Sequence, residues 1–437
     1  MFCNQCEQAR HGTGCEDIGM CGKDADIQSL QETLLYGVKG MAAYAHHARR
    51  LGAVDDRVNA FIEEALFATL TNVNFDLQSH LELVLECGRQ NLRVMQMLDA
   101  AHTSRFGQPT PVEVQEGTKP GPGILVTGHD LLDLADLLEQ TSGSGINVYT
   151  HGEMLPAHMY PTLRAHTHLA GHVGGAWQDQ RTDFHEFAGP VLATTNCLLI
   201  PRNGYGDRVF TTRVTAIPGG TRIAGNDFSP LIRKALDCPS LPEKPVRRST
   251  IGFHHSVILG LADQIVEAVK TGVIRHVFLI GGCDGAEPGR NYFSEFAART
   301  PSDSLILTLG CGKYRIRDYD YGAITLPSGT SVPRLLDMGQ CNDAYGAIQV
   351  ASALAHVFDC SVNDLPLTIV LSWFEQKAVA VLLTLLALGV KRIRIGPAPP
   401  AFVSPGVFGV LQEKFDLRLV GGDAAADVRA ALAPATA

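Results

Sequence analysis

The sequence has no long basic run that could form a nucleic-acid-binding face. Its 45 acidic and 36 basic side chains give a formal net charge of −9 at pH 7. The most basic stretch, KPVRR at residues 244–248, is short and isolated, too small to neutralise a row of phosphates. We therefore expect neither DNA nor RNA as a partner.

The sequence also shows no membrane-spanning segment and no export signal. The longest apolar run, Ala378 to Val390, has 13 residues and lies between Lys377 and Lys391. It is too short for a hydrocarbon layer of about 30 Å, so it predicts a buried helix. The first residues, MFCNQCEQ, lack the basic start and apolar stretch of a secretory peptide. We expect a cytoplasmic protein without membrane contact.

Cysteine, by contrast, is plentiful, with 11 residues in the chain. In a reducing compartment such thiols bind metal or do chemistry more often than they form disulfides. Four of them, Cys3, Cys6, Cys15 and Cys21, follow the spacing C-x2-C-x8-C-x5-C. Zinc sites usually contain two C-x2-C pairs, whereas only one pair is present here. Four separately placed thiolates favour a cubane iron–sulfur cluster, with zinc as the alternative.

The chain changes character after its first quarter. Ile27, Leu30, Leu34 and Val38 repeat at helical spacing, which predicts a small helical bundle. Residues 106–123 contain four prolines and four glycines and are interpreted as a linker.

Short apolar runs then alternate with helical segments. The runs lie at residues 124–127, 146–149, 276–280, 305–309, 367–371 and 392–395, and a proline-rich break occupies residues 238–245. Near-continuous apolar strands followed by helices are typical of parallel sheets that are covered on both faces. The predicted class is α/β: a helical domain with the cysteine loop (1–113), then two Rossmann-like parallel α/β domains (114–245 and 246–437).

Polar and sulfur side chains follow these strands where parallel sheets place their sites. His129, Glu153, Cys283, Cys311 and Glu375 come just after a predicted strand, often beside glycine, and Cys197 and Cys341 occupy similar loops. Taken singly, a cysteine after a strand is more often a small buried hydrophobe, the reading we adopt for Cys87, Cys238 and Cys360. Glu153 and Glu375 could equally be carboxylates at helix N-termini. Their coincidence at one edge favours a shared site.

Five histidines surround Glu153 in the sequence: His151, His158, His166, His168 and His172. They lack the H-E-x-x-H spacing of a zinc protease. We expect one or two of them to support the site or move protons, and the others to lie at the surface.

Longer motifs carry a resemblance to a known family. They are MFCNQCEQ at residues 1–8, TGHDL at 127–131, VYTHGEMLPAH at 148–158, TTNC at 194–197, IGGCDG at 280–285, CGKYR at 311–315, LDMGQCND at 336–343 and LSWFEQKAV at 371–379. From Met1 to about Phe402 the chain resembles the hybrid-cluster proteins, also called prismane proteins or hydroxylamine reductases. It is similar to their compact subgroup, which lacks a second helical bundle. Residues 321–331 look longer than the usual spacer and predict a surface hairpin or loop.

The resemblance implies two iron–sulfur cofactors. Cys3, Cys6, Cys15 and Cys21 would hold a 4Fe–4S cluster. The hybrid iron–sulfur–oxygen cluster, of the 4Fe-2O-2S type, would be held by His129, Glu153, Cys197, Cys283, Cys311, Cys341 and Glu375. Cys283 matches the position that carries a persulfide, and Lys377 matches a lysine beside the cluster. This set suits the chemistry, since thiolates prefer sulfide-bridged iron while carboxylate and imidazole suit oxygen-bridged iron.

The implied activity is reduction of hydroxylamine by two electrons and two protons to ammonia and water. Glu153, Cys283 and Lys377 are the candidate catalytic residues. The segment GGCDG at 281–285 does not match the G-x-G-x-x-G dinucleotide fingerprint, so we expect a separate electron-donor protein.

Four alternatives remain. Nitric oxide, reduced to nitrous oxide, is a competing substrate. A redox sensor or protein S-nitrosylation through Cys283 would show thiol transfer but negligible turnover. A carbon monoxide dehydrogenase-like enzyme would contain nickel. A zinc-stabilised α/β protein would be colourless.

Overall fold

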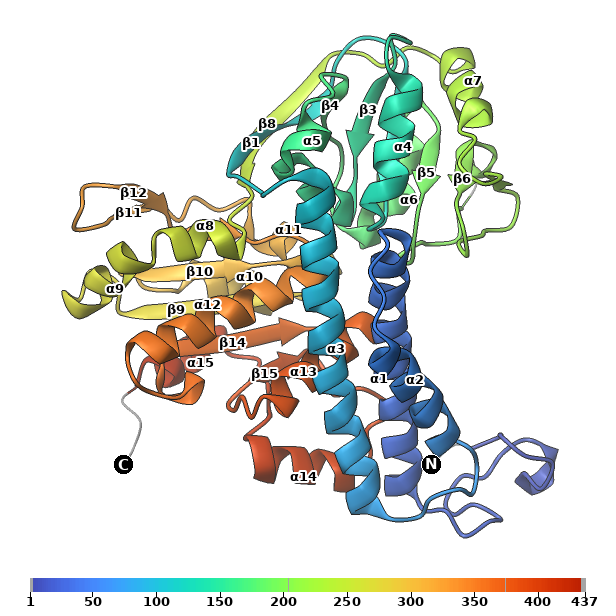
Figure 1. The fold of residues 1–437 in the computed structure, drawn as a ribbon, viewed down its shortest axis with the longest axis vertical. Helices are drawn as coiled ribbons and strands as arrows, with labels where there is room; N and C mark the ends of the chain where they lie inside the picture. The colour runs from blue at the N-terminus through green and yellow to red at the C-terminus, as the bar shows by residue number, and fades with distance from the viewer. Residues whose placement is uncertain (1–2, 203, 374, 434–437) are drawn as a thin grey trace.

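The computed structural model describes residues 3–202, 204–373 and 375–433. Met1, Phe2 and Phe374, which belong to two of the quoted motifs, lie outside these ranges. A column of long helices runs beside two stacked α/β units (Figure 1). The expected class, a helical N-terminal part followed by two parallel α/β units, is confirmed.

The helical column is formed by α1 (Ala25–Arg50), α2 (Asp56–Ala68) and α3 (Leu77–Phe106). Asp24 caps α1 by accepting a 2.8 Å hydrogen bond from the Ile27 N–H, as expected of an aspartate at this position. The predicted apolar positions Leu30, Leu34 and Val38 are buried. The helical spacing read from the sequence is therefore confirmed.

A helix from the far end of the chain completes this column. The predicted buried helix corresponds to α13 (Gln376–Ala387), which packs against both α1 and α3. Gly40 and Gly88 allow the close approach: a Cβ on Gly40 would lie 2.3 Å from the carbonyl oxygen of Gln376. Apolar residues of α1, α3, α13 and the second sheet consequently share one core.

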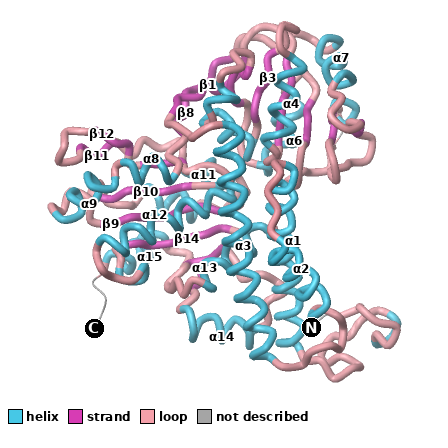
Figure 2. Tube along the Cα trace, in the orientation of Figure 1, coloured by secondary structure: helices cyan, strands magenta, loops and turns pink. Residues whose placement is uncertain are grey.

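The first sheet has eight strands in the order β7-β6-β5-β2-β3-β4-β1-β8. They are β1 (Val112–Thr118), β2 (Gly123–Thr127), β3 (Asn147–Thr150), β4 (Leu169–His172), β5 (Val191–Ala193), β6 (Val209–Thr211), β7 (Thr221–Arg222) and β8 (Lys244–Ile251). Its pairs are parallel except that of β8 with β1. Helices α4 (Leu131–Thr141), α5 (Pro161–Arg164), α6 (Gln180–Glu186) and α7 (Ser229–Asp237) belong to this unit (Figure 2).

The segment interpreted as a linker contains strand β1. Its prolines and glycines lie mostly on either side of the strand, and Val114 and Glu116 inside it are buried. The strand was missed because its partner, β8, lies more than a hundred residues later in the chain and pairs with it antiparallel. The chain thus leaves the first sheet only after β8.

The second sheet has six parallel strands in the order β13-β10-β9-β14-β15-β16. They are β9 (His276–Gly282), β10 (Ser304–Thr308), β13 (Leu335–Asp337), β14 (Leu367–Ser372), β15 (Arg394–Gly396) and β16 (Arg418–Leu419). Its further helices are α8 (His255–Gly260), α9 (Ala262–Lys270), α10 (Tyr292–Ala298), α11 (Lys313–Ile316), α12 (Ala344–Val357), α14 (Pro405–Phe415) and α15 (Ala424–Leu432).

The longer spacer at residues 321–331 folds as expected. It forms an antiparallel hairpin of β11 (Ala323–Thr325) and β12 (Ser331–Pro333), which projects from the second unit (Figure 1). Among the described helices, none combines the length and apolar character needed to cross a membrane.

The close packing of α13 on α3 gives a stability prediction. In Gly88→Ala the new methyl group would lie 2.1 Å from the carbonyl oxygen of Leu383, so the helices have to separate. We expect the unfolding free energy to fall by about 1–3 kcal/mol. In the matched control Gly409→Ala, on α14, no atom lies within 4 Å of the new methyl group. This control should keep or gain stability, by up to about 1 kcal/mol. Anaerobic thermal unfolding followed by circular dichroism checks both, and equal melting temperatures would contradict the packing.

Candidate metal centre

The four N-terminal cysteines lie in the loop that precedes α1, which also carries the short 3-10 helix η1 (Arg10–Gly12). The backbones of Cys3 and Cys15 pair through two hydrogen bonds of 3.1 and 2.8 Å. Both of these side chains are buried, whereas Cys6 and Cys21 are exposed. Hydrogen bonds to the backbone at Arg10 and Met20 lower the pKa of Cys15, which favours the thiolate form that binds metal.

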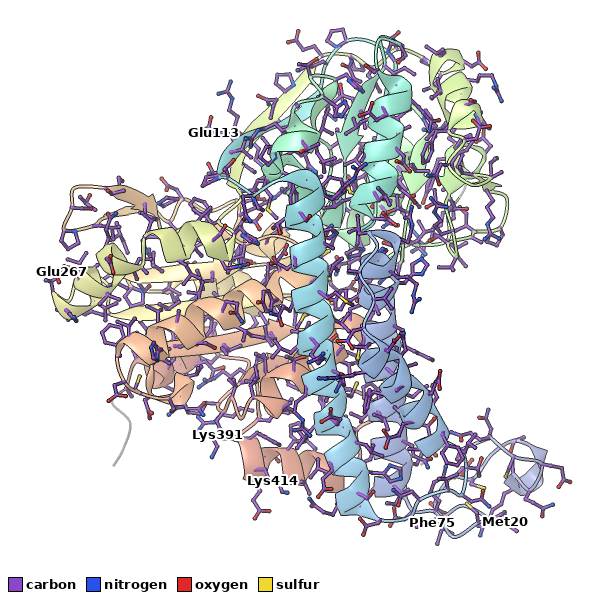
Figure 3. The ribbon with its side chains drawn as sticks, in the orientation of Figure 1. Met20, Phe75, Glu113, Glu267, Lys391 and Lys414 are labelled. Atoms are coloured by element: carbon purple, nitrogen blue, oxygen red, sulfur yellow. The ribbon has the colours of Figure 1, made fainter. Side chains whose placement is uncertain are left out.

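This cysteine loop is at one end of the helical column and reaches the surface. Met20 in the loop and Phe75 in the adjoining turn before α3 lie there with large exposed fractions of 54% and 48% (Figure 3). Gln5 and Thr71 join the two segments by a hydrogen bond of 3.5 Å. The loop is therefore accessible to a second protein.

The other seven predicted residues follow the carboxyl ends of parallel strands. In the first sheet His129, Glu153 and Cys197 follow β2, β3 and β5; in the second Cys283, Cys311, Cys341 and Glu375 follow β9, β10, β13 and β14. Because parallel strands end at the same edge of a sheet, each sheet presents its set along one edge.

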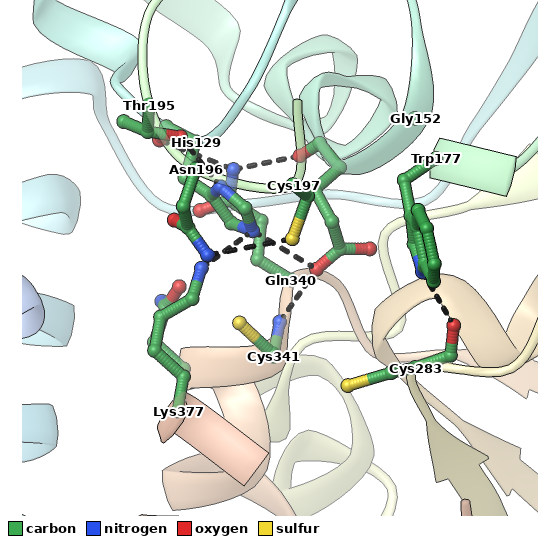
Figure 4. Close-up of polar contacts among 12 residues, drawn as sticks. His129, Gly152, Trp177, Thr195, Asn196, Cys197, Cys283, Gln340, Cys341 and Lys377 are labelled. Atoms are coloured by element: carbon green, nitrogen blue, oxygen red, sulfur yellow. Dashed lines mark hydrogen bonds and ion pairs between the residues drawn. The ribbon is translucent and has the colours of Figure 1, made fainter. Parts of the chain in front are cut away.

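The two edges face one another and are joined by hydrogen bonds. The Gln340 side-chain amide donates to the carbonyl oxygens of Glu153 (2.7 Å) and His129 (3.2 Å). The Cys341 N–H donates to Glu153 Oε2 at 2.9 Å. The Trp177 indole donates to the Cys283 carbonyl at 3.0 Å (Figure 4). These bonds bring side chains of both sheets to one site.

Sharp glycine turns lead several of these side chains into the site. Gly128, Gly152, Gly282 and Gly310 have positive φ and directly precede His129, Glu153, Cys283 and Cys311. The need for glycine is strictest at Gly128 and Gly282. A Cβ on Gly128 would lie 2.3 Å from Thr194 Oγ1, and a Cβ on Gly282 would lie 1.9 Å from the Ser372 carbonyl oxygen. Cys197 itself has a φ of 66°, a strained conformation for a residue with a side chain.

His129, Glu153 and Cys341 form the tightest group in the site. Their potential ligand atoms all lie within 4.8 Å of one another, and His129 Nε2 is 3.8 Å from Glu153 Oε2. The sulfur atoms of Cys197, Cys283 and Cys341 point toward the same space (Figure 4).

The remaining two candidates border this group. Cys311 is buried, and its burial together with the negative charges of Glu153, Cys197 and Cys283 raises the pKa of its thiol. Glu375 caps α13 by accepting a 3.1 Å hydrogen bond from the Lys377 N–H, so the N-terminal role considered from the sequence is also present. Its charge also raises the pKa of Cys283 and Cys341. The structure thus gathers all seven side chains, while their role as metal ligands stays a prediction.

Lys377 is the buried cation of this site. Its ammonium lies 2.8 Å from His129 Nε2 and 3.9 Å from Glu375 Oε1. Burial lowers its pKa, but the charges of Cys341, Glu375, Cys197 and Glu153 outweigh burial and raise it. Burial and Lys377 hold the pKa of His129 well below its usual value. The Lys377 ammonium donates to His129 Nε2, so a neutral His129 carries its proton on Nδ1 and donates a hydrogen bond from there to Thr195 Oγ1 (2.8 Å).

The donor set fits a cationic metal assembly. Burial raises the pKa of Glu153 and of the four thiols, that of Cys341 to about 12, and for Glu153 the nearby ammonium groups of Lys313 and Lys377 only partly offset it. Glu153 Oε1 is buried and has no hydrogen-bond partner among the described residues. Four sulfurs with two carboxylates and an imidazole match iron that is bridged by both sulfide and oxygen.

An apolar cavity borders this site, and a polar cavity lies near it, at Tyr314. An apolar cavity of about 60 Å³ is lined by Cys283 and Cys341 and shares Leu309, Leu371 and Val381 with a larger apolar cavity of about 190 Å³. On another side, a polar cavity of about 530 Å³ lies between the two α/β units. Its lining includes Tyr314, whose hydroxyl donates to the carbonyl oxygen of Gly152 at 2.6 Å.

More of the histidines near Glu153 are buried than the sequence led us to expect. Three of them, His151, His158 and His172, are buried, and His166 and His168 are partly exposed. His172 Nε2 lies 3.1 Å from the Tyr314 hydroxyl, and Thr150 Oγ1 connects His172 to His158. The sequence did not show this burial, because the partners come from different strands and from α11.

Several residues that shape the site were not among the candidates predicted from the sequence. The Tyr44 hydroxyl, on α1, donates to Cys341 Sγ at 3.2 Å. Trp177 and Gln340 join the two sheets, and buried Lys313 bonds to the Gly339 carbonyl at 2.8 Å. Of these, Lys313 and Gln340 could have been suspected, since they lie in the motifs at residues 311–315 and 336–343. Cys87, set aside from the sequence, is buried on α3, where burial raises its pKa to about 12.

Comparisons with known proteins agree with this architecture. The family model described as Prismane/CO dehydrogenase family matches residues 1–84 and 78–427. A hydroxylamine reductase of Moorella thermoacetica is 60% identical over 418 residues, which cover 96% of this chain and 97% of the relative. A hydroxylamine reductase of Geobacter metallireducens is 41% identical over an alignment of 551 residues covering 99% of each chain. That alignment is longer than this chain, as expected for a compact member.

Solved structures give the same fold. The nickel-free carbon monoxide dehydrogenase from Thermococcus sp. AM4 has a TM-score of 0.78 at 16% identity, covering 98% of this chain and 89% of that one. An acetyl-CoA synthase/carbon monoxide dehydrogenase with [Fe4S4] clusters has a TM-score of 0.76 at 14% identity, covering 99% and 86%. With two sheet edges that meet at a mixed sulfur and oxygen donor set, and with a match along nearly its whole length, the chain belongs to the Prismane/CO dehydrogenase family.

Proposed function

We propose that the protein is an iron–sulfur reductase that converts hydroxylamine, two electrons and two protons into ammonia and water. The observation that carries the proposal is the convergence of four thiols, two carboxylates and an imidazole beside the buried ammonium of Lys377. The 60% identity to a hydroxylamine reductase over nearly the full length supports it.

Two groups of residues would hold the cofactors. Cys3, Cys6, Cys15 and Cys21 would hold a 4Fe–4S cluster. The set that would hold a hybrid iron–sulfur–oxygen cluster is His129, Glu153, Cys197, Cys283, Cys311, Cys341 and Glu375, with Cys283 as a persulfide. Such a cluster, when bound, supplies electrons and an electron-accepting metal ion for a substrate oxygen or nitrogen.

The side chains around it would supply protons and exclude bulk water. Lys377 remains an ammonium in this surrounding and lies 2.8 Å from His129 Nε2 and 3.9 Å from Glu375 Oε1. Burial raises the pKa of Glu153, so its carboxyl group can hold a proton at higher pH than an exposed glutamate. Cleavage of the N–O bond needs such a positioned acid, because the departing oxygen leaves as water.

Substrate and electrons would enter from different directions. The polar cavity beside Tyr314 suits the entry of polar hydroxylamine and the exit of ammonia and water. Electrons would come from a separate donor protein that contacts the exposed cysteine loop at Cys6 and Cys21. The cytoplasm is the proposed location, because a reducing compartment keeps these thiols free.

The ligand assignment predicts loss of turnover on loss of single donors. Glu153→Ala and Cys283→Ala should each lower the hydroxylamine reduction rate at least ~100-fold, because each removes a side chain that holds the reactive centre. The rate is measured without air, with a chemical reductant, and is referred to iron content. Cys360→Ala, in the loop after α12, is the matched control and should leave the rate unchanged. Activity that survives both site substitutions at full iron content would overturn the assignment.

The proton-donor role predicts a separate effect at Lys377. Lys377→Met removes the buried ammonium while keeping a chain of similar length, and should lower kcat for hydroxylamine about 10²–10⁴-fold. The control Lys391→Met changes an exposed lysine that points away from the body of the protein (Figure 3). An unchanged kcat in Lys377→Met, with normal iron content, would exclude this residue as the acid.

Nitric oxide reduction to nitrous oxide is the second candidate, because the apolar cavities lead to Cys283 and Cys341. Small uncharged molecules enter such cavities, whereas hydroxylamine would have to lose its hydrating water molecules.

The alternative of a carbon monoxide dehydrogenase-like enzyme is supported only by similarity of fold, since the solved structures are 14–16% identical in sequence. Metal analysis for nickel tests it, and assays of thiol transfer from Cys283 test the sensor alternative.

Narrowing the apolar route should separate the two substrates. Val381 lines both apolar cavities, so Val381→Phe fills their junction. We expect a nitric oxide reduction rate that is reduced several-fold and an unchanged hydroxylamine rate, measured side by side on the same preparation. Leu388→Phe, which lies only along the larger cavity, is the control. Equal effects on both substrates would count against an apolar route for nitric oxide.

A further inference from the structure

A second cluster of possible metal ligands lies outside the centre described above. It consists of Asp99, on α3, with His254 and His255, at the start of α8. One potential ligand atom of each residue lies within 4.8 Å of those of the other two. The residues come from chain segments about 155 positions apart, so the fold rather than local sequence brings them together.

Hydrogen bonds orient His254 toward Asp99. His254 Nε2 lies 2.8 Å from Asp99 Oδ1, while Nδ1 accepts a 3.3 Å hydrogen bond from the Ser256 N–H and lies 2.8 Å from Ser256 Oγ. The ring is buried, with 2% of its surface exposed. With Nδ1 accepting, the proton of a neutral His254 lies on Nε2 and points at Asp99 Oδ1, and a bound cation would displace this proton and take both atoms as ligands.

The imidazole of His255 directs its Nδ1 atom toward Asp99 as well. Its Nδ1 is 3.9 Å from Asp99 Oδ1, is buried, and has no hydrogen-bond partner among the described residues. The close approach of α12 fixes the ring, because a Cβ on Gly346 would lie 3.1 Å from this nitrogen. Burial and His254 lower the pKa of His255, which keeps the imidazole in its neutral, ligating form.

We propose that Asp99, His254 and His255 bind one divalent cation of the zinc class. Two imidazoles and one carboxylate are ligands that Zn²⁺ commonly takes, and a water molecule would complete a tetrahedron. The same set is poor for Ca²⁺ and Mg²⁺, which prefer oxygen ligands. The Asp99 and His255 side chains are 14% and 16% exposed, so a cation can reach the site from solvent.

A purely structural role accounts for only part of the geometry. The Asp99–His254 hydrogen bond by itself joins α3 to α8, and it leaves His255 Nδ1 buried without a partner. A bound cation would satisfy this nitrogen and link the helical column to the second α/β unit. The site would be additional to the iron centre and does not depend on the proposed reductase activity.

Zinc binding to the iron-loaded protein tests the proposal. The protein is incubated anaerobically with zinc chloride, passed through a desalting column, and analysed for zinc and iron by mass spectrometry. We expect one zinc ion per chain. Asp99→Asn and His255→Gln should weaken zinc binding at least about tenfold in a chelator competition, with unchanged iron. The matched control His356→Ala, an exposed histidine on α12, should bind zinc like the parent protein.

A replacement that restores a ligand separates binding from folding. His255→Cys keeps a metal-binding atom at this position and should regain zinc binding that His255→Gln has lost. If His255→Gln and His255→Cys bind zinc equally at equal iron content, His255 is not a ligand and the proposal fails. It fails equally if the parent protein takes up no zinc, or if His255→Gln retains all of it, since the zinc then lies at other groups such as exposed thiols.

Discussion

The structure depends on the contact between the carboxyl edges of two parallel sheets. Each edge alone presents only part of the donor set, since His129, Glu153 and Cys197 come from the first sheet and the other four from the second. Gln340 holds the edges together by donating to two carbonyl oxygens of the opposite sheet. Cys341 adds a hydrogen bond from its N–H to the Glu153 carboxylate. Displacement of one unit against the other would therefore break these bonds and divide the site.

Helix α13 couples this contact to the helical column. It begins at the capping residue Glu375, carries Lys377 into the site, and is packed against α1 and α3 along Gly40 and Gly88. Tyr44 of α1 reaches Cys341 from the same side. The helices thus close the site and fix the position of the Lys377 ammonium beside His129. The shared apolar core explains why a helical part and a distant α/β unit behave as one structure.

Burial gives the site its chemical character. It raises the pKa of the thiols and of Glu153, and it keeps His129 neutral. Such groups bind a metal cation readily, because coordination replaces the lost hydration and favours the deprotonated ligands. A polar cavity lies between the two α/β units, and a separate apolar cavity is lined by Cys283 and Cys341.

The class of fold, the helical spacing of Leu30, Leu34 and Val38, and the position of five of the seven candidate ligands after a strand could be predicted from the sequence. These features are local, since periodicity, glycine turns and strand ends are written in neighbouring residues. Strands β5 and β13, which precede Cys197 and Cys341, were not among the predicted runs. Strand β1 escaped prediction because its partner β8 is distant in the chain. Tertiary structure alone decided that the two sheet edges face each other, that Tyr44 and Trp177 border the site, and that Asp99 meets His254 and His255. The reason is physical: such contacts join segments far apart in the chain, and the packing of helices and sheets sets their distance rather than any local pattern.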